Sequence, residues 1–165
     1  MNILSMMIRA ARPSRIADMP AVAKPFWMPK GYEGMTFFGH IITHTRQDAE
    51  AFNRTFSAIN NHEMIHLYQA RDCHDSWLRF YWRYFGYWLR ITLAALASRL
   101  PSRKGRRERL PRNAGYVLNP FEMEAYRHMH DLHYLDDKES GTTGWRRYAG
   151  MSLRERVLTL RRYIS

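Results

Sequence analysis

The chain has 165 residues, enough for one domain with a modest hydrophobic core, and its single cysteine, Cys73, excludes an internal disulfide. Its formal net charge of +11 favours an anionic partner, either an anionic membrane surface or nucleic acid. Nucleic acid is disfavoured, because the basic cluster at 99–112 contains Pro and Gly and lacks both interleaved aromatic residues and a helix-turn-helix pattern.

The first 45 residues predict an arm followed by a strand. Residues 1–30 are basic and contain four prolines, and their apolar patch is too short for a secretory signal, so we expect a mobile basic N-terminal arm. Residues 34–45, GMTFFGHIITHT, predict one strand or half of a hairpin, because Phe, Ile and Thr favour strands. We interpret His40 and His44 as exposed strand residues rather than metal ligands.

Residues 62–66 read HEMIH, an HExxH motif. Residues 53–70 contain no Pro or Gly and predict one continuous helix, with the motif near its C-terminal end. On a helix, His62 and His66 lie one turn apart on the same face, where two imidazoles can bind one zinc ion, and Glu63 lies close enough to activate water there. The alternative is a pair of solvated surface histidines.

Residues 77–100 predict an aromatic-rich helix. Its length approaches that of a membrane span, but Arg79, Arg83 and Arg90 interrupt it on one narrow stripe. Two interpretations stay open: a core helix packed on the HExxH helix, or a helix at the lipid interface, where aromatic residues and arginines both sit well. The basic segment 99–112 that follows predicts a loop.

The segment NPFEMEAY predicts the start of another helix, with Asn119 as its N-cap and Pro120 at its first position. Zinc sites for hydrolysis use three protein ligands, and Glu122 in the first turn of this helix is a candidate for the third. Glu124 is its rival, but it lies about 200° round the helix, so only one of the two carboxylates faces a given metal.

Other polar residues of this region have ordinary interpretations. Tyr126, one turn beyond Glu122, can bind a zinc ligand or an oxyanion, although a half-buried core tyrosine is the simpler interpretation. His128, His130 and His133 are expected on a solvated face of the continuing helix.

The strings HEMIHLYQ and NPFEMEAY together resemble the gluzincin metallopeptidases, in which a Glu on a later helix is the third zinc ligand. The likeness is greatest to small bacterial HExxH proteins that carry a Gly-Met-Thr strand, HExxHxxQ, an aromatic helix and a Phe-Glu-x-Glu-Ala-Tyr segment, and it covers roughly residues 30–130. Aligning Ala125 with the Ala of the family's Glu-x-x-Ala-Asp pattern implies that Glu122 binds zinc. Tyr126 then stands where the family has Asp.

The C-terminal residues predict a short helix after a linker at 141–144. Ser152 and Glu155 form a capping-box pattern. Leucine, valine and isoleucine make one apolar stripe over 151–165, and the arginines are expected off it: Arg154, Arg156, Arg161 and Arg162.

These patterns predict a mainly α protein: a minigluzincin-like single domain with an active-site helix, a glutamate-bearing helix and a minimal β-sheet or edge strand. We expect an arm at 1–30, a metallopeptidase-like domain at 31–140, and a linker with an amphipathic helix at 141–165.

The resemblance implies a zinc-dependent peptidase with Zn²⁺ bound by His62, His66 and Glu122, and with Glu63 as general base. Its partners would be a peptide or protein substrate and, given the charge, an anionic membrane surface. We expect a cytoplasmic location, with membrane association left open. The alternative function is a non-catalytic membrane-surface or interaction protein with a vestigial or structural metal site.

Overall fold

The computed structural model describes residues 21–24, 26, 34–54, 57–99, 110–138 and 141–164. Over these residues the chain is mainly helical, with seven helices and one small sheet of three strands, as the predicted fold class requires. The chain divides into two compact units. The first, here called the sheet unit, comprises residues 1–80 and 125–143, and the second, the helical unit, comprises residues 81–124 and 144–165.

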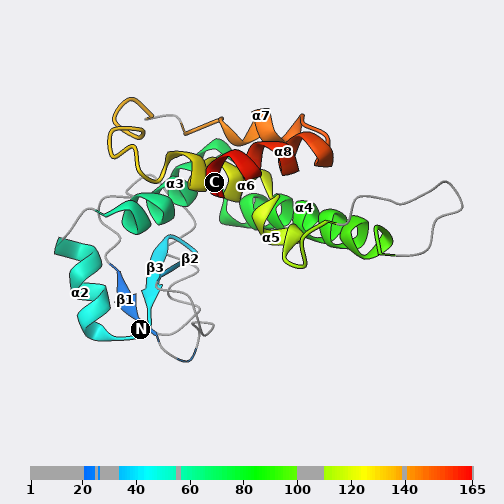
Figure 1. Cartoon of the computed structure of the whole chain (residues 1–165). Helices are drawn as coiled ribbons and strands as arrows, with labels where there is room; N and C mark the ends of the chain where they lie inside the picture. The colour runs from blue at the N-terminus through cyan, green and yellow to red at the C-terminus, as the bar shows by residue number, and fades with distance from the viewer. Residues whose placement is uncertain are drawn as a thin grey trace, which may run out of the picture. The chain divides into compact units, whose positions relative to one another are not determined.

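The segment predicted as one strand or half of a hairpin forms both strands of a hairpin, β2 (Met35–Phe37) and β3 (His40–Thr43), which pair antiparallel (Figure 1). Phe38 and Gly39 between them have φ values of 44° and 81°. Two consecutive positive φ values define the tight two-residue turn that suits the twist of a hairpin. Gly39 meets this requirement without strain, whereas Phe38 adopts a conformation that is uncommon for a large side chain.

The third strand, β1 (Val22–Ala23), pairs parallel with β3 and completes a sheet of order β1-β3-β2. It lies within the segment 1–30 predicted as a mobile arm, so part of that segment belongs to the sheet. Residues 1–20, 25 and 27–30 of the predicted arm lie outside the described residues, and for them the arm stays a prediction.

The helix α2 (Arg46–Arg54) starts at a capping sequence, Thr45 to Asp48. Thr45 Oγ1 accepts a hydrogen bond from the Asp48 N–H (3.1 Å), and Asp48 Oδ2 accepts one from the Thr45 N–H (3.1 Å). This reciprocal pair satisfies two backbone donors at the start of the helix. Ala49 then packs against Ile41 of β3, which places α2 on the sheet.

The HExxH motif lies on a separate helix, α3 (Ala58–Asp72), so the prediction of one continuous helix over 53–70 was wrong. Ser57 has extended backbone angles and its hydroxyl accepts from the Asn60 N–H (3.2 Å), which makes it an N-cap. The Asn60 side chain donates to Phe52 O (2.7 Å) and so occupies a carbonyl near the end of α2. The break places the motif in the middle of α3 rather than near its C-terminal end.

The helix α6 (Pro120–His128) begins as predicted, because Asn119 Oδ1 accepts a hydrogen bond from the Phe121 N–H (3.2 Å). It ends earlier than expected, and His130 and His133 lie in turns rather than on a continuing helix. The side chain of Asn61 supplies the reason. Its Nδ2 is 2.9–3.1 Å from three carbonyl oxygens that a longer helix would satisfy internally, those of His128, Met129 and Asp131.

The helical unit is built from α5 (Ala114–Val117), α7 (Trp145–Ala149), α8 (Leu153–Ile164), most of α4 (Trp77–Ala97) and the first part of α6. Its core is aliphatic and joins α4, α5 and α8 through five buried residues: Ile91, Ala95, Ala114, Leu118 and Val157. Gly115 allows the close approach, because a Cβ at that position would overlap the Thr92 side chain of α4.

The predicted aromatic helix is therefore α4, and one of its faces belongs to the core, where Trp77, Phe80 and Ile91 are each at most 3% exposed. None of the described helices combines the length and the apolar character needed to cross a membrane.

The C-terminal helix α8 shows the predicted capping box, with Ser152 N donating to Glu155 Oε2 (2.7 Å) and Glu155 N donating to Ser152 Oγ (3.3 Å). These hydrogen bonds lower the pKa of Glu155, because they favour its ionised form. Arg156, expected off the apolar stripe, is instead buried and donates to Leu118 O and Ala149 O, both at 3.1 Å. The guanidinium thus joins α8 to α5 and α7, and burial lowers its pKa.

We expect Arg156→Ala to lower the free energy of unfolding by about 2–3 kcal/mol, because two carbonyls lose a charged donor inside the protein. Arg154→Ala is the matched control: this side chain is exposed on the same helix, so the change should stay below about 0.5 kcal/mol. Urea denaturation followed by circular dichroism measures both values. Equal midpoints for the two variants would contradict the structural role of Arg156.

Candidate metal centre

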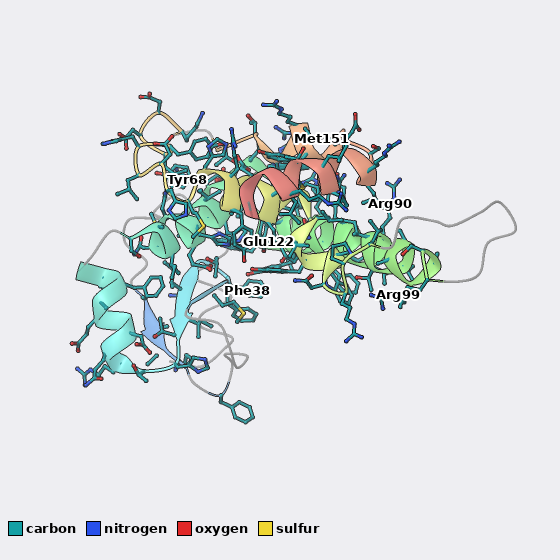
Figure 2. The ribbon with its side chains drawn as sticks, in the orientation of Figure 1. Phe38, Tyr68, Arg90, Arg99, Glu122 and Met151 are labelled. Atoms are coloured by element: carbon teal, nitrogen blue, oxygen red, sulfur yellow. The ribbon has the colours of Figure 1, made fainter. Side chains whose placement is uncertain are left out.

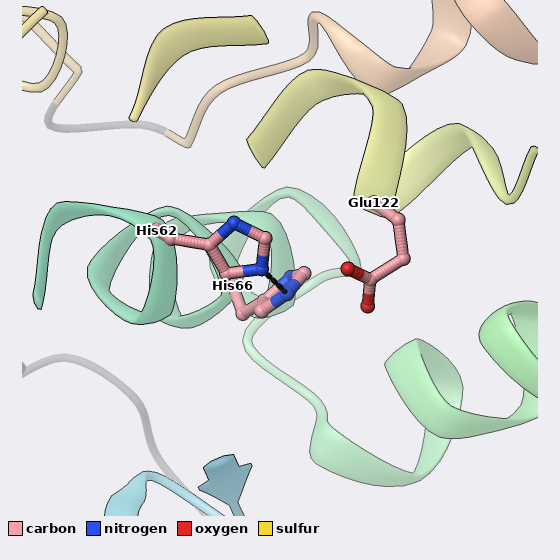
Figure 3. A group of neighbouring side chains, drawn as sticks. All are labelled: His62, His66 and Glu122. Atoms are coloured by element: carbon pink, nitrogen blue, oxygen red, sulfur yellow. Dashed lines mark hydrogen bonds between the residues drawn. The ribbon is translucent and has the colours of Figure 1, made fainter. Parts of the chain in front are cut away.

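The helix α3 presents its two motif histidines to each other. His62 and His66 are 6% and 7% exposed, and their Nε2 atoms lie 3.2 Å apart (Figure 3). Two nitrogens bound to one tetrahedral zinc ion at 2.0–2.1 Å would lie about 3.3 Å apart. The solvated surface pair considered as the alternative is wrong, because both rings are buried.

The orientation of His66 is fixed by a neighbour on the same helix. Its Nδ1 lies 2.8 Å from Gln69 Oε1, and Gln69 is fully buried. Because an amide oxygen only accepts, this contact keeps the proton on Nδ1 and leaves the Nε2 lone pair facing His62. Sequence reasoning gave Gln69 no role, although the spacing of three residues after His66 on one helical face was a usable signal.

A carboxylate completes the group. Glu122 is 3% exposed, and its Oε1 accepts a hydrogen bond from the Tyr84 hydroxyl (2.7 Å). His62, His66 and Glu122 each offer one ligand atom, and these atoms lie within 4.8 Å of one another, so this buried group can hold a metal ion (Figure 3). Two imidazoles and one carboxylate form a donor set that zinc accepts in hydrolytic sites.

The position of Tyr126 agrees with this arrangement. Its ring lies 4.6 Å from that of His62 in an edge-on contact. Glu122 is one helical turn before Tyr126, so both side chains lie on the same face of α6. Tyr126 is 38% exposed, which agrees with the half-buried tyrosine of the simpler interpretation, and its ring covers one edge of His62.

The rival carboxylate has another function. Glu124 is fully buried, and its Oε2 accepts a hydrogen bond from the Trp145 N–H at 3.0 Å, at the first residue of α7. It is absent from the group of potential ligands found among the described residues. Glu124 therefore stabilises the start of a helix, where a negative charge is favourable.

Glu63, between the two histidines, is held by β2. Its Oε2 accepts hydrogen bonds from both the backbone N–H and the hydroxyl of Thr36, each at 2.6 Å. Both donors bind the same oxygen, so Oε1 takes no part in these two hydrogen bonds. Sequence reasoning placed Thr36 on a strand and assigned it no chemistry.

The remaining histidines lie outside the metal-binding group. His128 stacks on Tyr134 with ring centroids 3.8 Å apart, and burial, followed by the charge of Arg127, lowers the pKa of His128. His133 is exposed and bonds Asp136 (2.8 Å), which raises its pKa.

The two strand histidines differ from their prediction. His40 is buried at 6% exposure and His44 is half-buried, so the expectation that both are exposed was wrong.

Comparisons with known proteins assign no family. No protein-family model matches the sequence, and no curated protein and no solved structure is significantly similar to it. The resemblance to gluzincins therefore rests on the motifs themselves and stays a prediction.

Proposed function

We propose that this protein is a zinc-dependent metallopeptidase of the gluzincin type. His62, His66 and Glu122 would hold the zinc ion, and Glu63 would act as general base. The observation that carries the proposal is the buried group of two imidazoles and one carboxylate, with a second carboxylate beside it on the same turn of α3.

The donor set alone leaves two classes of metal chemistry open. Two histidines and one carboxylate bind zinc in hydrolases, and they also bind iron in oxygenases. Glu63 favours hydrolysis, because a carboxylate fixed next to the metal ligands is the group that removes a proton from an attacking water. Oxygenases of that class have no need for such a base.

A bound zinc ion would polarise the scissile carbonyl and lower the pKa of water to about 7. The residues of the chain would do the rest. Thr36 holds one oxygen of Glu63, so that the other can accept a proton from the attacking water and pass it to the leaving amine. Gln69 orients His66, and Tyr84 orients Glu122, which keeps the ligands in place before the metal arrives.

The metal assignment predicts about one zinc ion per chain in the purified protein, measured by elemental analysis after dialysis. Glu122→Ala should weaken zinc binding by at least about tenfold. Loss of a residue that only supports a metal ligand already costs about 10–100-fold in metal affinity, and Glu122 would be a ligand itself. His133→Ala is the control, since this exposed histidine lies outside the group. Zinc content in Glu122→Ala equal to that of the wild type would sink the ligand assignment.

The catalytic assignment predicts that Glu63→Gln keeps its zinc and loses peptidase activity by about 10²–10⁴-fold, because the amide cannot accept the proton. Cleavage of quenched fluorescent casein, together with zinc content, separates this effect from metal loss. Glu50→Gln, at an exposed site on α2, is the matched control and should keep full activity. Full activity in Glu63→Gln would remove the general base from the mechanism.

The positioning of Glu63 predicts a loss of about tenfold in kcat for Thr36→Val, with KM and zinc content unchanged. Valine has the same shape as threonine but lacks the hydroxyl that binds Glu63 Oε2. Thr36→Ser keeps the hydroxyl and should restore most of the rate. A structural role alone would lower the unfolding temperature of both variants and leave the kcat of the folded protein unchanged.

A further inference from the structure

The helix α4 is apolar on two opposite faces. One face lies in the core, as Ile91 and Ala95 show with 2% exposure each. The other, here called the outer face, follows the helical spacing of three and four residues and stands in solvent. It consists of seven residues with exposures between 37% and 81%: Leu78, Trp82, Phe85, Trp88, Leu89, Leu93 and Leu96.

The exposed apolar side chains of the described residues are concentrated on α4. Among the described residues, eleven large hydrophobic side chains are exposed, and seven of them lie on the outer face. Single exposed apolar residues are ordinary, whereas a contiguous apolar stripe along a whole helix marks an interaction surface. Water is therefore an unfavourable environment for the outer face.

Charge identifies the kind of partner. By sequence, the helical unit has fifteen basic and four acidic residues, which gives it the whole net charge of +11, whereas the sheet unit has eleven of each. No Asp or Glu occurs between Ser76 and Arg107, a stretch with eight basic residues. Apart from Leu78, the apolar stripe thus belongs to the strongly cationic part of the chain, and its partner should be anionic.

The arginines of α4 lie beside the stripe. Arg79, Arg83 and Arg90 are about 60–100° round the helix from Trp82, which puts them along one border of the outer face. Arg90 is exposed (Figure 2), as is Arg79, whereas Arg83 is half-buried. In this position a guanidinium reaches phosphate groups while the neighbouring tryptophans and leucines enter the apolar layer.

We infer that the outer face of α4 docks on an anionic lipid surface. The helix would lie in the plane of the interface, with its apolar side chains at the boundary between headgroups and acyl chains. Each arginine near the surface adds attraction to anionic lipid. The inference rests on exposure and charge, and it is independent of the proposed zinc chemistry.

Two other partners fit the same observations less well. A second copy of the chain would bring two identical rows of arginine together, each in a unit of charge +11, and so meet repulsion. A single-stranded nucleic acid would stack on aromatic rings, but four of the seven outer-face residues are leucines, which have no π-face.

The test is co-sedimentation of the full chain with vesicles of phosphatidylcholine, with and without phosphatidylglycerol. We expect binding only to the anionic vesicles, with weaker binding as the salt concentration rises. Trp82→Ser should lower the partition coefficient about tenfold, because the most exposed side chain of the outer face loses its apolar contact. Leu158→Ser, at a 48% exposed site on α8, is the matched control and should bind like the wild type.

Several results would overturn the inference. Absence of binding to anionic vesicles, or equal partitioning of Trp82→Ser and Leu158→Ser, would do so directly. A dimer in sedimentation velocity that Trp82→Ser abolishes would assign the outer face to a second copy. An RNA gel shift lost in the same variant, without vesicle binding, would assign it to nucleic acid. Leu93→Ser changes a second outer-face residue and should weaken vesicle binding as Trp82→Ser does. Far-UV circular dichroism of all variants shows whether they are folded, which separates lost docking from lost folding.

Discussion

The burial of polar side chains on α3 is the constraint on which the described structure depends. A polar group taken from water needs a partner inside the protein, and three of these buried side chains of α3 find theirs on three other parts of the chain. Asn60 binds the end of α2, Asn61 binds the carbonyls after α6, and Glu63 binds β2. The helix that carries the candidate ligands is thereby the helix that holds the sheet unit together, so site geometry and fold stability share the same hydrogen bonds.

Local signals in the sequence predicted the elements whose partners lie close in the chain. The cap of α6 at Asn119 and the capping box of α8 each close within three residues, so the pattern itself contains both partners. Asn61 and Arg156 were beyond such reasoning, because the acceptors of Asn61 lie 67–70 residues away and those of Arg156 lie 38 and 7 residues away on other elements. A helical wheel places Arg156 on the solvent-facing side of α8. Its burial is favourable because two carbonyl oxygens outside α8 accept hydrogen bonds from its guanidinium.

The candidate site shows the same division between local and distant contacts. The HExxH spacing sufficed to place two imidazoles on one helical turn, and the structure adds that both are buried. Which carboxylate faces them could not be read from the spacing of Glu122 and Glu124, because both lie near the start of one helix. Contacts from outside that helix distinguish the two carboxylates. The backbone N–H of Trp145 binds Glu124, while the hydroxyl of Tyr84 binds Glu122.

The inner and the outer face of α4 have different surroundings, and each needs its own explanation. Its inner side supplies Phe80, whose ring lies 6.2 Å from that of His66, and Tyr84, which binds Glu122. Its outer face is absent from the buried clusters of the described core, so polar residues at its most exposed positions, Leu78 and Trp82, would cost the fold little. Their presence beside a row of arginines therefore needs a reason outside the fold, and contact with an anionic interface accounts for both the apolar side chains and the charge.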